Sequence, residues 1–326
     1  MTGQVPPAGV PSGTRIGVVG AGRVGAVLAS ALRSAGHEIV AAAGDSDASR
    51  SRIDTLLPGV PRRKPTAVSR AGDLLLLTVP DDMLGNVVTQ LAASGAIREG
   101  QYVAHTSGRH GLAVLKPAAD VGAHVLAVHP AMTFTGTELD VPRLRGCAFG
   151  VTADQPDTIA MAETLVSDLR GNLVWVPEGK RTLYHAGLAH GANHLVTLVA
   201  QAMELLRDSG ATDPAATLRP LLTAALDNAL AMGDAALTGP IVRGDVETVR
   251  AHLADIAATA PHTLPSYVAM ARATLERVVL DGRVLPIRAA KLASVLDAAE
   301  VPTPLDRPAP LDHQGAPAAR PRSSRR

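Results

Sequence analysis

The sequence predicts an α/β fold, in which a Rossmann doubly wound parallel sheet is followed by an all-α C-terminal domain. Short apolar runs alternate with helical patterns from residue 14 to about residue 178, as expected for parallel strands that are linked by helices. A glycine-rich turn follows the first of these runs. From about residue 179 to residue 300 strand patterns vanish, and long Ala/Leu-rich segments predict helices.

These changes of pattern set the expected domain boundaries. We expect a flexible N-terminus over 1–13, a dinucleotide-binding Rossmann domain over 14–178, a helical substrate and dimerisation domain over 179–300, and a disordered Pro-rich tail over 301–326. The tail ends in arginines, so recruitment of an anionic partner is the alternative for that segment. The expected strands are RIGVVG, EIVAAAG, DLLLLTVP, QYVAHTSG, HVLAVHPA, CAFGVTA and NLVWVP, and the expected helix breaks are DSGATDP, LTGPIVRGD and APHTLP.

Composition excludes several classes of function. A net charge of +1 and an aromatic content of 2% give no support for a nucleic-acid partner. The single cysteine, Cys147, excludes a disulfide within the chain and indicates a reducing compartment. No run reaches the ~18 apolar residues of a spanning helix, and no secretory signal is recognisable. We therefore expect a cytoplasmic protein with no membrane partner.

The segment IGVVGAGRVGAVLASALRSAGHEIV predicts a dinucleotide site, because its G-x-G-x-x-G pattern joins an expected strand to an expected helix. Gly20 permits the tight turn, Gly22 allows a pyrophosphate to approach the backbone, and Gly25 lets the helix pack closely on the strand. The helix N-terminus then directs free N–H groups at the phosphates. The cofactor-binding residues expected here are Gly20, Gly22, Arg23, Val24 and Gly25.

The second strand favours NADP as the cofactor, with NAD as the alternative. NAD-binding proteins carry an acid at the end of this strand, where it binds the ribose hydroxyls. Here the strand ends at Gly44, with Asp45 and Asp47 only after it. Arg50 and Arg52 follow with several serines, within reach of a 2′-phosphate, and we name Arg50 as the contact. The alternative for both arginines is the solvated start of a helix.

Polar residues at three later strand ends complete the expected Rossmann site, because open α/β sheets bind ligands at the carboxyl ends of their strands. Val79 and Pro80 are expected to line the nicotinamide side, and Ser107, which follows another strand, is a further expected cofactor-binding residue. His105 and His129 each follow a strand. A histidine is suited to general acid catalysis when a carbonyl is reduced, although a lone histidine is more often structural. A plain strand-to-helix turn is the alternative at Pro80.

The helical half contributes further candidates in TLYHAGLAHGANHLVTL. His185 and Asn193 are eight residues apart, so they share roughly one helix face. A buried Asn193 would need a polar partner, which could be a substrate oxygen, the nicotinamide carboxamide or neighbouring backbone. His190 and His194 have the spacing of two metal ligands, but no third ligand is identifiable, and we expect no metal.

Arg243, in LTGPIVRGD, is the fourth feature of interest. Its guanidinium could bind a substrate carboxylate bidentately. Equally, Arg243 could form an ion pair with Asp245, which is expected to cap the next helix.

In combination, GAGRVG, HTSG, VHPAMTF, YHAGLAHGANHLVTL and LTGPIVRGD resemble the Rossmann-like oxidoreductases that carry a C-terminal domain of unknown function, DUF2520. The wider superfamily resembles that of 6-phosphogluconate dehydrogenase, pyrroline-carboxylate reductase and ketopantoate reductase. The resemblance implies a Rossmann domain and a helical domain, an active site in the cleft between them, and a homodimer formed through the helical domain.

The resemblance also implies roles for particular residues. Ketopantoate reductases use a helical lysine four residues before an asparagine; Asn193 matches that asparagine, but Ala189 stands at the lysine position. HPAM is similar to the His-Pro motif of prephenate dehydrogenases, where the histidine contacts the reacting hydroxyl. This similarity favours His129 as the proton donor, with His185 as the next choice.

The resulting hypothesis is an NADP-dependent oxidoreductase that reduces a small-molecule substrate, a 2-keto acid such as ketopantoate. His129 would stabilise and protonate the oxygen, Asn193 would orient the substrate, and Arg243 would hold its carboxylate. Imine reduction of the pyrroline-carboxylate type is one alternative, because it needs no strong protein acid. A non-catalytic NADP(H)-binding sensor is the other.

Overall fold

The computed structural model describes residues 13–299, and these residues form two compact units. Unit 1 ends at Ala192 and unit 2 begins at Asn193, later than the expected boundary after residue 178. Residues 1–12 of the expected flexible N-terminus and the whole expected disordered tail lie outside the described residues.

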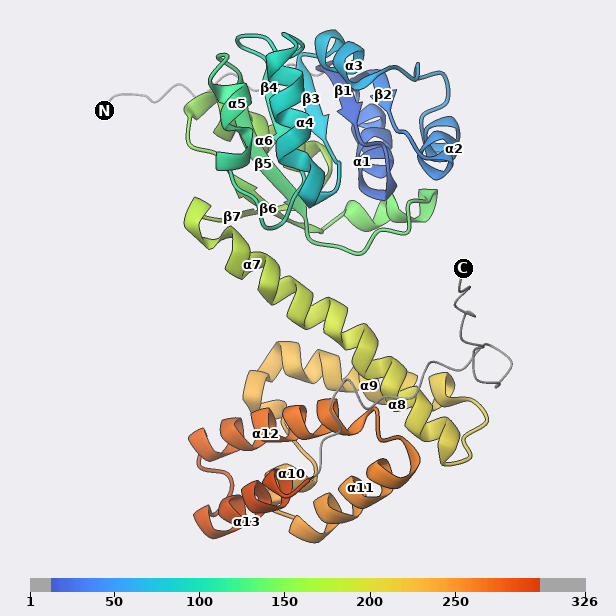
Figure 1. Ribbon diagram of the computed structural model, residues 1–326, viewed down its shortest axis with the longest axis vertical. Helices are drawn as coiled ribbons and strands as arrows, with labels where there is room; N and C mark the ends of the chain where they lie inside the picture. Colours follow the sequence, from blue (N-terminus) through green and yellow to red (C-terminus); the bar gives the residue numbers. More distant parts are fainter. Residues whose placement is uncertain (1–12, 300–326) are drawn as a thin grey trace, which may run out of the picture. The chain divides into compact units, whose positions relative to one another are not determined.

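Unit 1 is built on a seven-stranded sheet (Figure 1). All seven expected strands are present in it. They are β1 (Arg15–Val19), β2 (Glu38–Ala43), β3 (Leu74–Leu77), β4 (Tyr102–His105), β5 (His124–Pro130), β6 (Ala148–Thr152) and β7 (Asn172–Trp175), in the spatial order β2-β1-β3-β4-β5-β6-β7. The Rossmann fold class is therefore confirmed.

The expectation of an entirely parallel sheet is wrong at one pair, because β6 runs antiparallel to β5. Every other neighbouring pair is parallel. A parallel connection needs a crossover, usually a helix. Between β5 and β6 the chain forms only the short 3₁₀ turns Glu138–Asp140 and Pro142–Leu144. The chain therefore turns back beside β5.

Two hydrophobic cores lie on the two faces of the sheet. In β3, Leu74 and Leu76 belong to the core on one face of the sheet, whereas Leu75 and Leu77 belong to the core on the other face. Adjacent residues of a strand face opposite sides, which explains why this strand is four consecutive leucines. The helices of unit 1 are α1 (Arg23–Ser34), α2 (Asp47–Leu56), α3 (Pro65–Ala71), α4 (Asp81–Ala93), α5 (Lys116–Ala119), α6 (Pro156–Asp168) and α7 (Arg181–Leu188).

Unit 2 is helical, as predicted, with breaks at the three expected places. A π-helical turn, Ala189–Asn193, joins α7 to the first of its helices. Among residues 13–299, no helix combines the length and apolar character needed to cross a membrane. The helices of unit 2 are α8 (His194–Asp208), α9 (Pro214–Met232), α10 (Pro240–Arg243), α11 (Val246–Thr259), α12 (Leu264–Leu280) and α13 (Pro286–Asp297).

The core of unit 2 is formed by α10 to α13. In contrast, α8 has no buried residue and α9 has only Leu218. Their apolar side chains are therefore left on the surface.

Candidate functional site

The turn after β1 has the geometry that the glycine pattern predicts. Gly20 has a φ of +94°, which favours glycine, and a Cβ on it would come within 2.7 Å of the Val79 nitrogen. A Cβ on Gly25 would overlap the Thr78 hydroxyl. That hydroxyl donates a hydrogen bond of 2.7 Å to the Gly20 carbonyl. Thr78 thus holds the turn against the end of β3.

Gly22 differs from these two glycines, because the space around it is open. A Cβ on Gly22 would have no atom of the protein nearer than 3.7 Å. Gly22 is also the N-cap of α1, which has no side-chain cap and no acid in its first turn. The first N–H groups of a helix lack intrahelical partners, and a helix N-terminus attracts anions. The N-terminus of α1 is therefore suited to a phosphate.

A cavity of about 620 Å³ lies at this end of the sheet, within the size range of ligand pockets. It extends across the carboxyl ends of β1, β2, β3 and β4. We call it the strand-end pocket. Its lining includes seven of the nine expected cofactor-binding residues, namely Gly20, Gly22, Arg23, Val24, Val79, Pro80 and Ser107.

The part of the pocket beyond β2 contains Asp45, Ser46 and Ser49. The expected contact Arg50 is not among the lining residues. Its guanidinium instead forms an ion pair of 2.8 Å with Asp47, three residues before it on α2. The geometry thus favours the alternative interpretation, in which Arg50 is a solvated residue at the start of a helix and not a cofactor contact.

Two other arginines meet beside this part of the pocket. A Cβ on Gly136 would lie 2.5 Å from Nε of Arg52 and 2.7 Å from Cγ of Arg23. Within residues 13–299, no hydrogen bond or ion pair engages either guanidinium. The Arg52 guanidinium and the aliphatic part of the Arg23 side chain therefore both lie against Gly136.

A buried carboxylate fixes the loop that brings Gly136 to this place. Asp140 is fully buried and accepts hydrogen bonds of 2.7 Å from the N–H groups of both Thr135 and Gly136. Burial alone would raise the pKa of Asp140, but these hydrogen bonds hold it below its usual value. The loop begins after Pro130, the last residue of β5 and the neighbour of His129.

His129 forms a pair with Tyr184 of α7. Its Nδ1 lies 3.1 Å from the Tyr184 hydroxyl, and the two rings meet edge to face. The hydroxyl packs over Gly150, where a Cβ would overlap it. Burial raises the pKa of Tyr184, so the hydroxyl keeps its proton. Burial, together with the charge of Arg181, lowers the pKa of His129 to about 4. His129 is therefore neutral at pH 7.

Gly108 connects this pair to the strand-end pocket. It follows Ser107 of the pocket lining. A Cβ on Gly108 would lie 3.0 Å from Nε2 of His129 and would also press on the ring of His185. The two imidazoles, whose centroids are 5.9 Å apart, thus lie next to the last residue of the pocket wall.

His105 is engaged on both ring nitrogens, and this geometry favours a structural role over the catalytic one. Nδ1 accepts a hydrogen bond of 3.1 Å from the Ser107 N–H, and Nε2 lies 2.9 Å from the Gly111 carbonyl. The side chain is fully buried, and this burial lowers its pKa to about 4. His105 therefore shapes the 105–111 loop and leaves no nitrogen for a substrate.

Arg181 attaches α7 to the sheet. Its side chain is 1% exposed and donates to three carbonyl groups, those of Ser107, His110 and Gly150. It also lies over the Tyr184 ring, one turn along α7. This attachment explains why α7 belongs to unit 1 and why the division of the chain comes after it.

The remaining expected residues are divided between the two units. His185 lies beside His129, whereas Asn193 is exposed, at the end of the π-helical turn and in unit 2. Arg243 lines a pocket of unit 2 and makes no ion pair with Asp245. Asp245 instead caps α11 by accepting from the Thr248 N–H at 3.1 Å. Within residues 13–299, no three His, Cys, Asp or Glu side chains gather as a possible metal site.

Sequence reasoning missed Tyr184, Arg181 and Asp140. One signal was available for Tyr184, because the chain has only three tyrosines and this one directly precedes His185. Arg181, Tyr184 and His185 also have the spacing of one helix face. For Asp140 no local pattern exists.

Family comparisons identify both halves of the chain. Residues 7–130 match the Rossmann-like domain, and residues 147–274 match DUF2520, a domain of unknown function. The chain is a Rossmann-like protein with a DUF2520 domain. The DUF2520 match begins just before β6, so the family boundary falls where the sheet ceases to be parallel. The comparison with curated proteins found no match.

Solved structures share the fold at low sequence identity. A Bacteroides fragilis protein, solved as a candidate NADP oxidoreductase, has 21% identity and a TM-score of 0.69 over 81% of this chain and 98% of its own. The Aspergillus terreus reductive aminase in complex with NADPH and ethyl levulinate has 16% identity and a TM-score of 0.59, over 86% and 99%. The Plasmodium falciparum pyrroline carboxylate reductase with NADP bound has 12% identity and a TM-score of 0.54, over 87% and 98%.

Proposed function

We propose that the protein is an NADP-dependent oxidoreductase that reduces the carbonyl group of a small 2-keto acid. The observation that carries this proposal is the continuity from the strand-end pocket, through Ser107 and Gly108, to the His129–Tyr184 pair. The open space at Gly22 and the uncapped α1 fit a pyrophosphate. Solved structures of this fold with NADPH or NADP bound support the choice of cofactor.

His129 and Tyr184 supply the proton in this proposal. NADPH, when bound, supplies the hydride to the carbonyl carbon. The Tyr184 hydroxyl keeps its proton because burial raises its pKa, and it donates this proton to Nδ1 of His129, so that the neutral imidazole presents Nε2–H. The carbonyl oxygen takes the Nε2 proton while Nδ1 takes the Tyr184 proton, and the phenolate recovers a proton from solvent. The transfer is favourable because a phenol is a stronger acid than an alcohol.

Reduction of a C=N bond is the second candidate, and one observation favours it. His129 is neutral, since its pKa is lowered to about 4, so it would not repel a protonated imine. A pyrroline carboxylate reductase and a reductive aminase share the fold. An iminium already carries its proton, so this reaction does not require the Tyr184 proton.

The test is NADPH consumption at 340 nm by the purified protein, with ketopantoate, other small 2-keto acids and cyclic imines as substrates. We expect turnover of a 2-keto acid. Turnover of imines alone would replace the first candidate by the second. Tight NADPH binding without turnover of any compound would instead indicate the non-catalytic sensor.

The preference for NADP over NAD is expected to depend on Arg52. Its guanidinium is unpaired and lies at Gly136, beside the side chain of Arg23, which lines the pocket; there it could reach a 2′-phosphate. Arg52→Ala should weaken NADPH binding about tenfold, the value of a charge-assisted hydrogen bond, and leave NADH binding unchanged. Arg50→Ala is the matched control, because Arg50 is paired with Asp47. Equal effects of both substitutions in a fluorescence titration would contradict this assignment.

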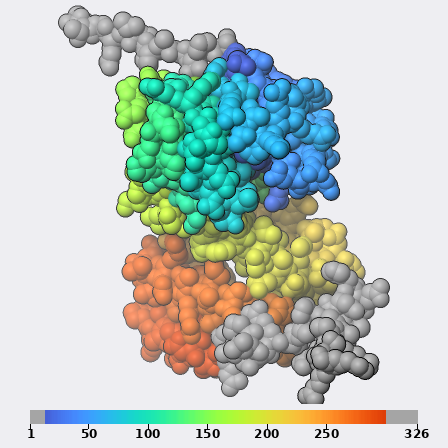
Figure 2. Space-filling view, turned by 45° about the horizontal axis from the view of Figure 1, so that its top comes forward, coloured from blue at the N-terminus to red at the C-terminus, as the bar shows by residue number. Residues whose placement is uncertain are grey.

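We also propose a homodimer formed through α8 and α9, which contribute the yellow and gold surface in Figure 2. Val196 is 71% exposed and Leu230 is 80% exposed, on helices that bury almost nothing. An apolar surface of this kind usually marks an interface.

Light scattering after size exclusion should give a dimer, and Leu230→Asp should shift it to monomer. Leu280→Asp, at an exposed leucine of α12, should not. A monomeric wild-type protein in this measurement would contradict the proposed homodimer.

A further inference from the structure

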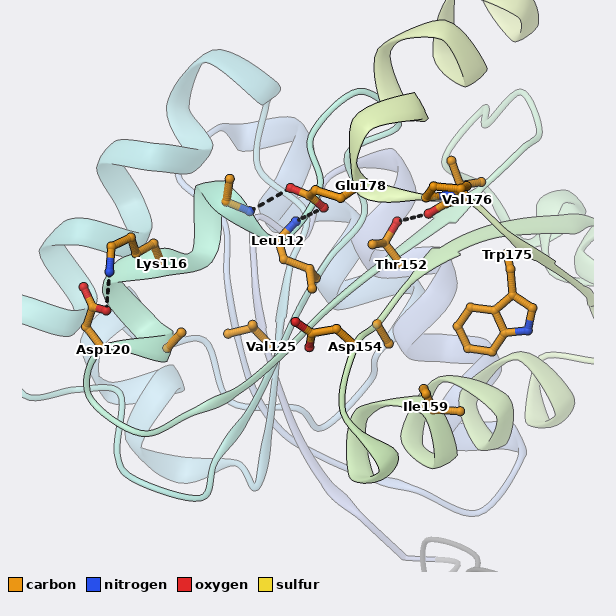
Figure 3. Close-up of a pocket in the computed structure, with 14 residues that line it drawn as sticks. Leu112, Lys116, Asp120, Val125, Thr152, Asp154, Ile159, Trp175, Val176 and Glu178 are labelled. Carbon is orange, nitrogen blue, oxygen red and sulfur yellow. Dashed lines mark hydrogen bonds and ion pairs between the residues drawn. The ribbon is translucent and has the colours of Figure 1, made fainter.

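Unit 1 has a second cavity that shares no residue with the strand-end pocket. It measures about 770 Å³ and lies over β5, β6 and β7, on the side where β5 begins. We call it the Trp175 groove. Figure 3 shows its lining, which comes from α5, the ends of β6 and β7, and α6. Its apolar side chains include Leu112, Val125, Ile159, Trp175, Val176 and Pro177.

The groove exists because little covers this part of the sheet. The helix α5 is a single turn, and β7 is the edge strand. Trp175, the only tryptophan of the chain, is therefore 46% exposed. A large exposed aromatic surface in a concave site is typical of a ligand-binding position.

Charge in the groove favours a cationic ligand. Three carboxylates and one ammonium, that of Lys116, line it. Lys116 is engaged by Asp120 at 2.6 Å, and Glu178 accepts from the N–H groups of Leu112 and Ala113. Asp154 is the third carboxylate, and no hydrogen bond or ion pair within residues 13–299 engages it.

Asp154 and Trp175 both line the groove, and each can attract the same chemical group. Figure 3 shows the Asp154 side chain in the middle of the groove, with Trp175 on one side and Val125 on the other. An ammonium group is attracted both by a carboxylate and by the face of an indole ring. The aliphatic side chains around them would cover an apolar body. An anion or a neutral polar molecule would gain neither contact.

We propose that the Trp175 groove binds a small primary amine with an apolar body. The ammonium lies between the Asp154 carboxylate and the Trp175 indole, and the body lies on Val125 and Ile159. This site is separate from the strand-end pocket, so it does not depend on the proposed oxidoreductase activity.

The groove walls are continuous with the segments of the candidate catalytic site. Leu112 and Ala113 follow the loop that contains Gly108, and Glu178 precedes Arg181 and α7. The Glu178 carboxylate joins the two walls by hydrogen bonds of 2.7 and 3.0 Å. A ligand in the groove would therefore contact the two segments that position His129 and Tyr184.

The single tryptophan allows a direct test, because intrinsic tryptophan fluorescence reports on this groove alone. The full-length protein is titrated with n-hexylamine at neutral pH, and with n-hexanol and hexanoate as matched compounds. We expect a saturable fluorescence change with hexylamine, and binding that is about five- to tenfold weaker for hexanol. Hexanoate should bind more weakly still.

Two variants test the role of the carboxylate. Asp154→Asn should weaken hexylamine binding to the level of hexanol, whereas Asp157→Asn should leave it unchanged, because Asp157 lies on α6 outside the groove lining. The proposal is overturned if hexanol binds as tightly as hexylamine, if both variants behave alike, or if hexylamine causes no saturable change.

Discussion

Replacing His129 by alanine is expected to lower kcat for carbonyl reduction by about 10²- to 10⁴-fold, the range for loss of a positioned general acid. The affinity for NADPH should stay within about twofold of wild type, because His129 does not line the strand-end pocket. Rates at 340 nm and NADPH fluorescence titrations measure the two quantities. Between pH 5.5 and 8 the wild-type rate should lack a histidine titration, since burial holds the pKa of His129 at about 4.

Tyr184→Phe separates the two candidate reactions. It should lower kcat for a 2-keto acid by about 10- to 100-fold, and it should leave the reduction of a preformed iminium nearly unchanged. Unit 2 provides a matched control, because His252 and Tyr267 form a similar pair at 2.8 Å. His252→Ala and Tyr267→Phe should keep wild-type rates. Full activity of His129→Ala would remove His129 from the mechanism.

Replacing Arg181 by alanine is expected to reduce the free energy of unfolding by about 3 kcal/mol or more. The substitution leaves the Ser107, His110 and Gly150 carbonyl groups without their donor in a buried place. It also frees α7 from the sheet, so kcat should fall together with stability. Thermal unfolding followed by circular dichroism should show a Tm that is roughly 6–12 °C lower.

A control for this prediction is Arg98→Ala. Arg98 also donates to a backbone carbonyl, that of Gly72, and it pairs with Asp73. Its side chain is 45% exposed, so water replaces the lost partner and the cost should stay below about 1 kcal/mol. If the two arginine variants have the same Tm, Arg181 does not attach α7 to the sheet.

Much of the fold could be predicted because its signals are local. Each strand is an apolar run, and the turn after β1 needs glycine at positions that the pattern itself identifies. The antiparallel β6 could not be predicted in this way, because strand direction depends on the path of the loop before it. The choice between Arg50 and Arg52 depends on Asp47, whose pairing with Arg50 appears only in the folded helix.

Only some residues of the candidate site could be predicted from the sequence. His129 and His185 were found by their positions after a strand and in a helix. Tyr184 and Arg181 act through the packing of α7 on β4, β5 and β6, which brings together residues far apart in the chain. His105 had the same sequence signal as His129, and only the hydrogen bonds on both of its nitrogens show the difference.

The most direct measurement is a fluorescence titration of NADPH with the wild-type protein and Gly22→Val, together with the Tm of each. A Cβ at Gly22 would lie no nearer than 3.7 Å to the Gly20 carbonyl oxygen, its nearest neighbour, and a valine side chain would occupy the space assigned to the pyrophosphate. We expect wild-type protein to bind NADPH, and Gly22→Val to lose binding by more than about tenfold with its Tm unchanged. NADPH binding by Gly22→Val as tight as wild type, or no binding by either protein, would contradict the assignment of the strand-end pocket.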